Sequence, residues 1–135
     1  MNFQEKKDWK KVKFNQRFLN AFRGIYVFLR TTCHFFYIHI PIYLVMIFLG
    51  VCFKISEAEW LAIVFSIGLM FISEAFNTAI EIDIDLTSPE FHPYARDTKD
   101  VAAGAVLISV FMAIIIGLII FFPLIFTKIL FYVRM

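Results

Sequence analysis

The sequence has 135 residues, of which 61% are hydrophobic, and it contains 18 Phe, 5 Gly and a formal net charge of +2. A water-soluble core of this size cannot bury so many large apolar side chains, so the composition excludes an ordinary soluble domain and indicates a lipid environment. The length fits one domain over residues 1–135. Cys33 and Cys52 stand at opposite ends of an apolar run, and we expect both to be free thiols.

The first 30 residues are strongly basic, with eight Lys and Arg against two acidic residues. Apolar side chains recur among them at helical spacing, at Phe14, Phe18, Phe22 and Ile25. This pattern predicts an amphipathic helix over residues 13–30 that lies on the membrane surface with its basic side toward anionic head groups. For residues 1–10 we expect disorder and a purely topogenic role of the charges. The direct continuation into lipid-like sequence argues against a nucleic-acid partner.

Three apolar segments follow and predict transmembrane helices over residues 36–53, 60–82 and 101–126. Ser56 and Glu59 form a capping-box pattern just before the second of them. Pro89 and Pro93 end the helix of the second segment, and Pro123 marks the far end of the third segment. The predicted fold class is an all-α integral membrane protein with an N-terminal amphipathic surface helix and three transmembrane helices.

The basic N-terminus predicts the orientation, because Lys and Arg are retained on the cytoplasmic side of a membrane. With the N-terminus in the cytoplasm, three spans place the polar loop at residues 83–100 on the cytoplasmic side, where ATP is available. Lys128 and Arg134 run against the outside placement of the C-terminus, but they are outnumbered by the eight N-terminal cations.

The second apolar segment becomes polar on one side. A charge at bilayer depth costs about 2.5–3.5 kcal/mol on insertion scales, so the carboxylate of Glu74 indicates a protected interior. At about 100° per residue, Asn77 lies about 60° from Glu74, whereas Glu81 and Asp85 each lie within about 20° of it. Asp83 points to the opposite side. The spacing therefore predicts a column of polar groups that opens toward the cytoplasm.

These residue types suit phosphoryl transfer. A partly buried carboxylate such as Glu74 can act as a general base, and a second carboxylate two turns away can hold Mg²⁺ together with substrate phosphates. Lys99 can neutralise phosphate charge, and Glu90 and His92 can contact a nucleotide. No P-loop and no kinase Gly-rich loop occurs in the sequence. A proton or cation path would use similar groups.

The order of motifs in residues 74–106 resembles the signature of the prokaryotic diacylglycerol kinase family. The motifs are Glu74-x-x-Asn-Thr-Ala-Ile-Glu81, then Asp85, Ser88-Pro-Glu-Phe-His92-Pro and Lys99-Asp100-x-Ala-Ala-Gly-Ala-Val106. The Ser-Pro-Glu-Phe-His-Pro turn and the Ala-Ala-Gly-Ala segment are more similar to its undecaprenol kinase branch than to the Gram-negative diacylglycerol kinases.

The resemblance implies a homotrimer in the bacterial cytoplasmic membrane, with active sites between protomers that move the γ-phosphate of ATP to a lipid hydroxyl. It also implies Mg²⁺ as the cofactor. By the same resemblance Glu74 matches the catalytic base, Glu81 a metal carboxylate and Asn77 a polar contact of the active site. The nucleotide side comprises Glu90, His92, Lys99 and Asp100.

One departure from the family pattern concerns the metal. The family usually reads Arg-Thr-Glu-Arg-Asn-Phe after the surface helix, whereas this chain reads Arg30-Thr-Thr-Cys-His-Phe35. Thr32 therefore stands where the second metal carboxylate is expected, and it offers a neutral oxygen. This departure predicts weaker metal affinity or a substitute ligand, for which Asp85 is the first candidate and Asp97 the second.

Three classes of function remain open at this point. The leading one is an ATP-dependent lipid kinase that acts on undecaprenol or, next, diacylglycerol. The second is a catalytically degenerate family member that binds lipid or nucleotide, which the Thr32 departure favours. The third is a small ion-path or transport oligomer, which only the polar column supports.

Overall fold

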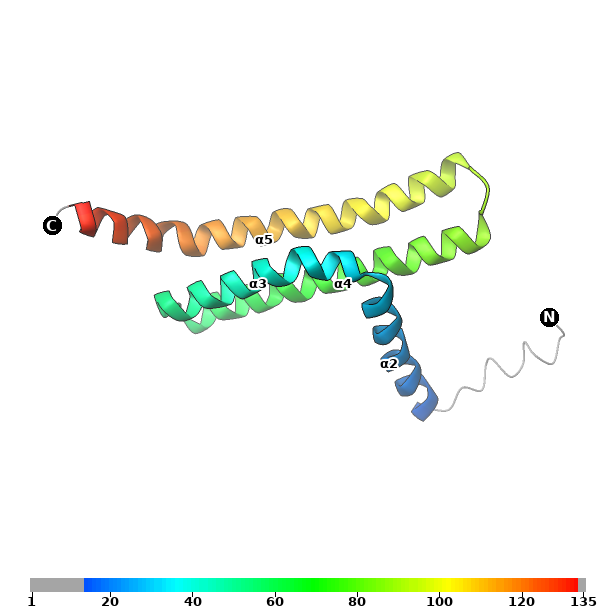
Figure 1. Cartoon of the computed structure of the whole chain (residues 1–135), viewed down its shortest axis with the longest axis horizontal. Helices are drawn as coiled ribbons and strands as arrows, with labels where there is room; N and C mark the ends of the chain where they lie inside the picture. Colours follow the sequence, from blue (N-terminus) through cyan, green and yellow to red (C-terminus); the bar gives the residue numbers. More distant parts are fainter. Residues whose placement is uncertain (1–13, 134–135) are drawn as a thin grey trace. The chain divides into compact units, whose positions relative to one another are not determined.

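A computed structural model describes residues 14–133 of the chain. The described residues form four α-helices, α2 (Phe14–Thr31), α3 (Cys33–Phe53), α4 (Glu57–Thr87) and α5 (Pro93–Val133) (Figure 1). They fall into two compact units, Met1–Cys33 with α2 and His34–Met135 with the other three helices. The all-helical fold class is confirmed, and α3, α4 and α5 are long and apolar enough to cross a membrane. The expectations for residues 1–10 lie outside the described residues.

Helix α2 forms where the basic amphipathic pattern predicts a helix, over Phe14–Thr31 against an expected 13–30. Phe18 and Phe22 are one turn apart on the same face, and their rings meet edge to face with centroids separated by 5.2 Å. Both rings are exposed to the surroundings. The position of this helix on the membrane surface stays a prediction.

The turn between α3 and α4 is closed by two capping motifs. The amides of Lys54 and Ile55 donate to the carbonyls of Val51 and Gly50, both at 3.2 Å, which is the pattern of a Schellman motif at the end of α3. Ser56 then caps α4 through the predicted capping box. Its amide donates to Oε2 of Glu59 at 2.7 Å, and its hydroxyl accepts from the amide of Glu59.

Lys54 occupies the left-handed position of this motif, with φ of 52°. Glycine normally fills this position because a Cβ is unfavourable there. We expect Lys54→Gly to raise the free energy of unfolding by about 0.5–1 kcal/mol. The measurement is thermal unfolding in detergent, with Lys54→Ala as the matched control that removes the same charge but keeps a Cβ. Equal stabilisation by both variants would contradict the role of backbone strain.

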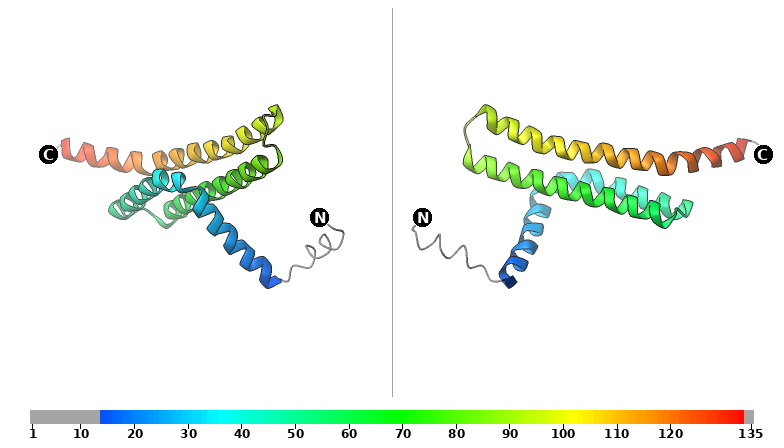
Figure 2. Two further views of the ribbon diagram at one scale, coloured as in Figure 1. Left: turned by 45° about the vertical axis from the view of Figure 1, so that its right-hand side comes forward. Right: turned by 180° about the vertical axis from the view of Figure 1, so that it is seen from behind.

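Helices α4 and α5 run antiparallel and side by side, joined by the connection at residues 88–92 (Figures 1 and 2). A polar contact links them near the middle of the pair, where the hydroxyls of Ser73 and Ser109 are 2.9 Å apart. Ser109 also donates to the carbonyl of Val106 at 2.7 Å and lies 3.4 Å from the sulfur of Met70. Small side chains at such a contact let two helices approach closely, which is how membrane helices pack.

Two apolar clusters attach α3 to this pair. The first lies near the α3–α4 turn and is built on Ile55, Ile63, Ile120 and Phe121. The second lies nearer the start of α3 and is built on Phe35, Tyr43 and Met70. Trp60 of α4 packs closely against Gly50, because a Cβ placed there would lie 2.8 Å from the indole ring. The three helices therefore form one bundle in which α4 packs against both α3 and α5.

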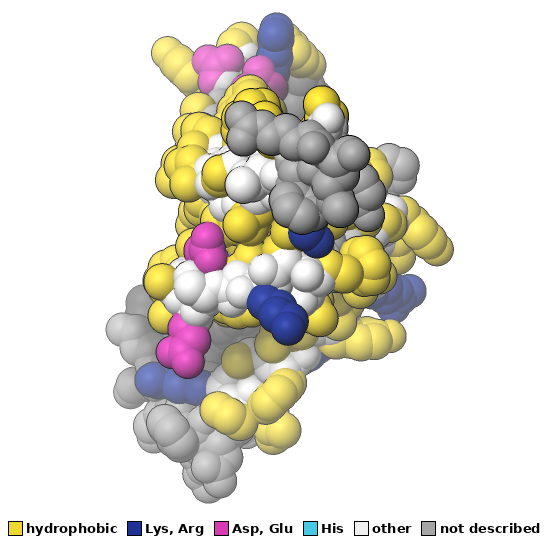
Figure 3. All heavy atoms as spheres, turned by 90° about the vertical axis from the view of Figure 1, so that its left-hand side faces the viewer, with side chains coloured by type: hydrophobic (Ala, Val, Ile, Leu, Met, Phe, Trp, Pro, Cys, Tyr) yellow, Lys and Arg dark blue, Asp and Glu magenta, His cyan; other side chains and the backbone are white. Residues whose placement is uncertain are grey.

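Many large apolar side chains are exposed on α3, α4 and α5. Figure 3, which views the end that bears the α3–α4 turn, shows such side chains around charged and other polar groups. Phe65 and Tyr37 are each 80% exposed, and Val101 is 74% exposed. Water would not favour such a surface, whereas lipid tails would cover it at no cost. The exposed apolar surface is therefore what a membrane protein requires.

Pro41 lies inside α3 and Pro123 lies inside α5, and neither proline ends its helix. The sequence predicts a helix that resumes over residues 94–100 and a third span over residues 101–126, and α5 runs without interruption from Pro93 through Pro123 to Val133. Pro93 fits the first helical position, where its missing N–H is not needed. The hydroxyl of Thr127 donates to the carbonyl of Pro123. In lipid the remaining backbone groups gain most by staying in the helix, so a single proline does not terminate it.

Candidate functional site

The polar column of α4 is defined here as Glu74, Asn77, Glu81 and Asp85. Asn77 is buried, with 8% of its surface exposed, and Glu74 and Glu81 are half-buried on the same side. Asp85 is exposed near the end of α4, and Asp83 is exposed as well. The upper three members of the column therefore face the interior of the bundle, and the lowest lies where α4 leaves it.

Asn77 and Glu81 are joined directly. Nδ2 of Asn77 donates to Oε1 of Glu81 at 3.1 Å, one helical turn away. The carbonyl Oδ1 of Asn77 is buried and has no hydrogen-bond partner among the described residues. A buried polar atom without a partner costs about 1–3 kcal/mol, so this oxygen is suited to accept a donor or a cation that a ligand brings.

Glu74 lies one turn before Asn77 on α4, nearer the middle of the helix. About one turn before Glu74, Met70 and Phe71 pack against Tyr43 of α3. Ser73, the residue next to Glu74, contacts Ser109 of α5, so α4 is fixed to α5 at this level.

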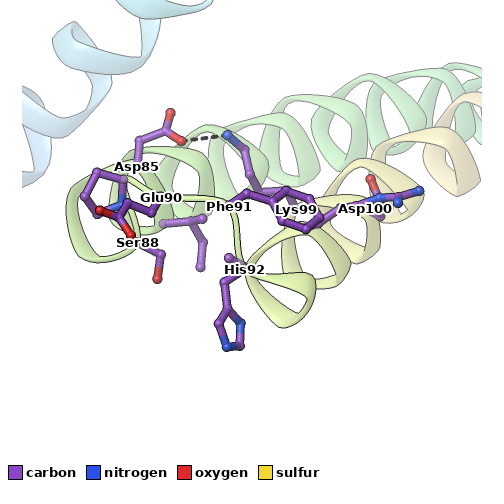
Figure 4. Close-up of a pocket in the computed structure, with 11 residues that line it drawn as sticks. Asp85, Ser88, Glu90, Phe91, His92, Lys99 and Asp100 are labelled. Atoms are coloured by element: carbon purple, nitrogen blue, oxygen red, sulfur yellow. Dashed lines mark hydrogen bonds and ion pairs between the residues drawn. The ribbon is translucent and has the colours of Figure 1, made fainter.

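A polar cavity of about 380 Å³ lies at the connection between α4 and α5 (Figure 4). We call it the turn cavity. It is lined by side chains from the end of α4, the connection and the first turns of α5. The charged and aromatic members are Asp85, Glu90, Phe91, His92, Arg96, Lys99 and Asp100. This space therefore gathers all four residues predicted for the nucleotide side, together with the lowest member of the polar column.

Ion pairs order the turn cavity. Lys99 reaches across from α5, and its Nζ lies 2.7 Å from Oδ1 of Asp85. Arg96 and Asp100 form a second pair at 3.5 Å along α5. His92 points away from the pair of Asp85 and Lys99 in Figure 4, and its ring lies beside Tyr94 with centroids 5.6 Å apart. Each cation of the turn cavity is thus paired with a carboxylate, and an anionic ligand can replace that carboxylate as its partner.

The donor set for a metal ion is small. Among the described residues, no group of three or more His, Cys, Asp or Glu stands together as a metal site. Thr32 lies between α2 and α3 and belongs with α2 to the N-terminal unit. Glu81 and Oδ1 of Asn77 nevertheless offer one carboxylate and one neutral oxygen on the same face of α4. This set fits Mg²⁺, which is commonly held by one or two carboxylates and completed by substrate phosphates.

Two residues near these groups are missed by the sequence argument. Arg96 lines the turn cavity and pairs with Asp100, and its position one turn before Asp100 is a signal that could have indicated it. Tyr43 of α3 packs against Phe71, three residues before Glu74 on α4, and no motif in the sequence points to that contact. Asp97, the second candidate for a substitute metal ligand, is exposed and does not line the turn cavity.

Comparisons with known proteins address the same region. Residues 19–121 match the family described as prokaryotic diacylglycerol kinase. An undecaprenol kinase of Bacillus subtilis (strain 168) is 40% identical over 111 residues, which are 82% of this chain and 89% of that protein. A diacylglycerol kinase of Helicobacter pylori (strain J99 / ATCC 700824) is 40% identical over 60 residues, covering 44% of this chain and 47% of its own. One from Synechocystis sp. is 46% identical over 50 residues, covering 36% and 29%. No solved structure matches the chain.

Proposed function

The chain belongs to the prokaryotic diacylglycerol kinase family, and we propose that it transfers the γ-phosphoryl group of ATP to the hydroxyl of a membrane lipid alcohol. Undecaprenol is the first candidate, because the relative that matches most of this chain is named an undecaprenol kinase. Diacylglycerol is the second, because two further relatives carry that name. One observation carries the proposal. The polar column leads from the apolar part of α4 to the turn cavity at its end. A lipid kinase needs such a connection, because its lipid substrate lies in an apolar environment and ATP in a polar one.

The length of α4 supports this arrangement. Its 31 residues span about 46 Å, whereas the hydrocarbon core of a bilayer is about 30 Å thick. With Trp60 at one interface, as aromatic belts favour, about 20 residues cross the core and reach the other boundary near residue 80. Glu74 then lies about six residues, or about 9 Å, inside the hydrocarbon, and Glu81 and Asp85 lie at or beyond its edge.

In this proposal Glu74 is the general base. A lipid alcohol lies with its tail in the hydrocarbon, so its hydroxyl can reach the Glu74 carboxylate from the apolar side of the polar column. The carboxylate accepts the proton of the hydroxyl as the lipid oxygen attacks the γ-phosphorus. The bond from that phosphorus to the β–γ bridging oxygen breaks, and ADP leaves.

The turn cavity is the proposed nucleotide side, with Lys99 as its main cation and Glu90, His92 and Asp100 as further contacts. Lys99 is held by Asp85 at 2.7 Å, so ATP phosphates must replace that carboxylate as its partner. The pair with Asp85 keeps the Lys99 ammonium ion partnered before ATP binds. Asn77 lies between the base and the cavity, where it can contact the phosphate chain.

Glu81 and Oδ1 of Asn77 would hold Mg²⁺, with Asp85 as the candidate substitute for the carboxylate that Thr32 lacks. When bound, the ion neutralises charge on the phosphates and polarises the γ-phosphoryl group. The contact between Asn77 and Glu81 orients the carboxylate beforehand, because Nδ2 occupies one carboxylate oxygen and leaves the other available. The unpartnered Oδ1 supports this assignment.

We further propose a homotrimer in the bacterial cytoplasmic membrane, with the N-terminus and the turn cavity on the cytoplasmic side. The basic N-terminal stretch supports this orientation, because cations stay on that side. The exposed apolar faces of α3, α4 and α5 leave ample surface both for lipid and for neighbouring copies. The same relatives favour a kinase over the alternative of an ion path, for which the polar column remains the single support.

The experiment that tests the function uses the purified protein in mixed micelles with γ-labelled ATP and Mg²⁺. Undecaprenol and diacylglycerol are offered separately, and lipid-extracted label is measured over time. We expect label in at least one lipid, with a higher kcat/KM for undecaprenol.

Each other outcome is informative. Label in diacylglycerol alone would overturn the substrate assignment. No label in either lipid at any Mg²⁺ concentration, together with labelling by the Thr32→Glu variant, would show a degenerate family member with an incomplete metal site. No label in either protein would contradict the proposed kinase activity.

A further inference from the structure

Tyr43 is a buried tyrosine without a hydrogen-bond partner. It lies on α3 with 7% of its surface exposed, and its hydroxyl has no partner among the described residues. Buried tyrosine hydroxyls usually find one, because an unsatisfied polar group in an apolar interior is costly. A phenylalanine would fill the same space without this cost. The hydroxyl is therefore expected to have a partner that a ligand supplies.

The rings around Tyr43 fix its direction. It packs against Phe71 of α4 with centroids 5.8 Å apart and lies 6.1 Å from the ring of His39. His39 stacks on Phe35 at 4.1 Å, and its Nδ1 lies 2.9 Å from the carbonyl of Phe35. Because a carbonyl only accepts, Nδ1 carries the proton in this contact. The aromatic group on α3 is thus held in place by its own helix and by α4.

This aromatic group lies about one helical turn from the proposed base. Tyr43 packs against Met70 and Phe71 of α4, and Glu74 follows these two residues by about one turn of the same helix. The structure gives no direct hydrogen bond between Tyr43 and Glu74, although both are enclosed in the same bundle. A small polar group that bridges them would satisfy the tyrosine and meet the base at once.

An apolar cavity of about 210 Å³ adjoins these residues between α3, α4 and α5. Tyr43 and His39 are the lining residues with polar side chains, and the rest of the lining is aliphatic, glycine or sulfur-containing, including Met46 and Met70. At about 30 Å³ for each water-sized group, this volume holds about seven chain atoms. The space therefore suits a short length of hydrocarbon with a hydroxyl at one end.

We propose, on the basis of the proposed kinase function, that Tyr43 positions the lipid substrate by donating a hydrogen bond from its hydroxyl to the substrate's hydroxyl oxygen. The substrate's own O–H points to Glu74, and the carbons next to it lie in the apolar cavity. The hydroxyl oxygen has two lone pairs, so one accepts from Tyr43 while the other attacks phosphorus. The proton still passes to Glu74, and ADP is still the leaving group. Tyr43 orients the nucleophile and takes up no proton.

The test is Tyr43→Phe, which removes one oxygen atom and keeps the ring. We expect kcat/KM for undecaprenol to fall about 10-fold, as the loss of one substrate hydrogen bond predicts, while KM for ATP stays unchanged. The melting temperature in detergent is expected to be equal or higher, because an unpartnered buried hydroxyl is removed. Tyr37→Phe is the matched control, since Tyr37 is on the same helix and 80% exposed. It should match the wild type in both measurements.

The outcomes separate this inference from the function on which it rests. If Glu74→Gln loses activity but Tyr43→Phe keeps the kinetics of Tyr37→Phe, the kinase proposal stands and the role of Tyr43 is wrong. A lower melting temperature for Tyr43→Phe, with equal losses for lipid and ATP, would show a structural role and overturn the inference. If wild type labels no lipid, the failure lies in the proposed function itself.

Discussion

Glu74→Gln is expected to lower kcat for lipid phosphorylation by about 10³-fold, because a positioned general base contributes about 10²–10⁴-fold to such a step. Glutamine keeps the size and polarity of the side chain but cannot accept the proton of the lipid hydroxyl. Glu74 is half-buried, so the neutral amide should be tolerated by the fold. The measurement is initial-rate kinetics in mixed micelles with the better lipid substrate, together with the melting temperature of the variant.

The matched control is Glu57→Gln, at the other end of the same helix. Glu57 lies in the first turn of α4, is exposed and takes no part in the polar column. It should retain the wild-type kcat. If Glu74→Gln and Glu57→Gln turn over alike, Glu74 is not the base. If Glu74→Gln loses activity only together with its melting transition, its role is structural.

The architecture could be predicted because each element depends on local pattern and on lipid as the solvent. The capping box of Ser56 and Glu59, for example, is a short-range signal, and it forms as predicted. The far end of the third span is harder to predict: the predicted span stops at residue 126, whereas α5 continues to Val133. A helix in lipid gains by continuing past a single proline such as Pro123. The Schellman motif at Lys54 was also missed, since glycine is the usual signal for that position.

The contacts of the candidate site also fall into two groups, those within one helix and those between helices. Asn77 and Glu81 are one turn apart, so helical geometry alone predicts their contact. The pair of Asp85 and Lys99 joins two helices, and it needs the tight connection at residues 88–92 to bring them together. Tyr43 lies 31 positions before Glu74, and only the packing of α3 on α4 makes them neighbours. Contacts within a helix can therefore be predicted from the sequence, whereas contacts between helices depend on a packing that the pattern does not specify.

Glu81→Gln is the second variant for which we expect a large effect, a fall of at least about 100-fold in rate at a fixed low concentration of free Mg²⁺. Even the loss of a group that only supports a metal ligand costs about 10–100-fold in metal affinity, and Glu81 is proposed as a ligand itself. Since Thr32 supplies no charge, Glu81 is the carboxylate that the metal site depends on most. The measurement is the rate as a function of free Mg²⁺ at saturating lipid and ATP, and the half-saturating concentration should rise.

Asp85→Asn is the matched variant, because it removes one carboxylate from the same column, in a position where that carboxylate is paired with Lys99. If Asp85 serves only as the resting partner of Lys99, its loss frees the cation and changes KM for ATP without moving the Mg²⁺ dependence. If Asp85 replaces the missing carboxylate at Thr32, its loss raises the half-saturating Mg²⁺ concentration as Glu81→Gln does. An unchanged Mg²⁺ dependence in Glu81→Gln would contradict the proposed metal site, whichever role Asp85 has.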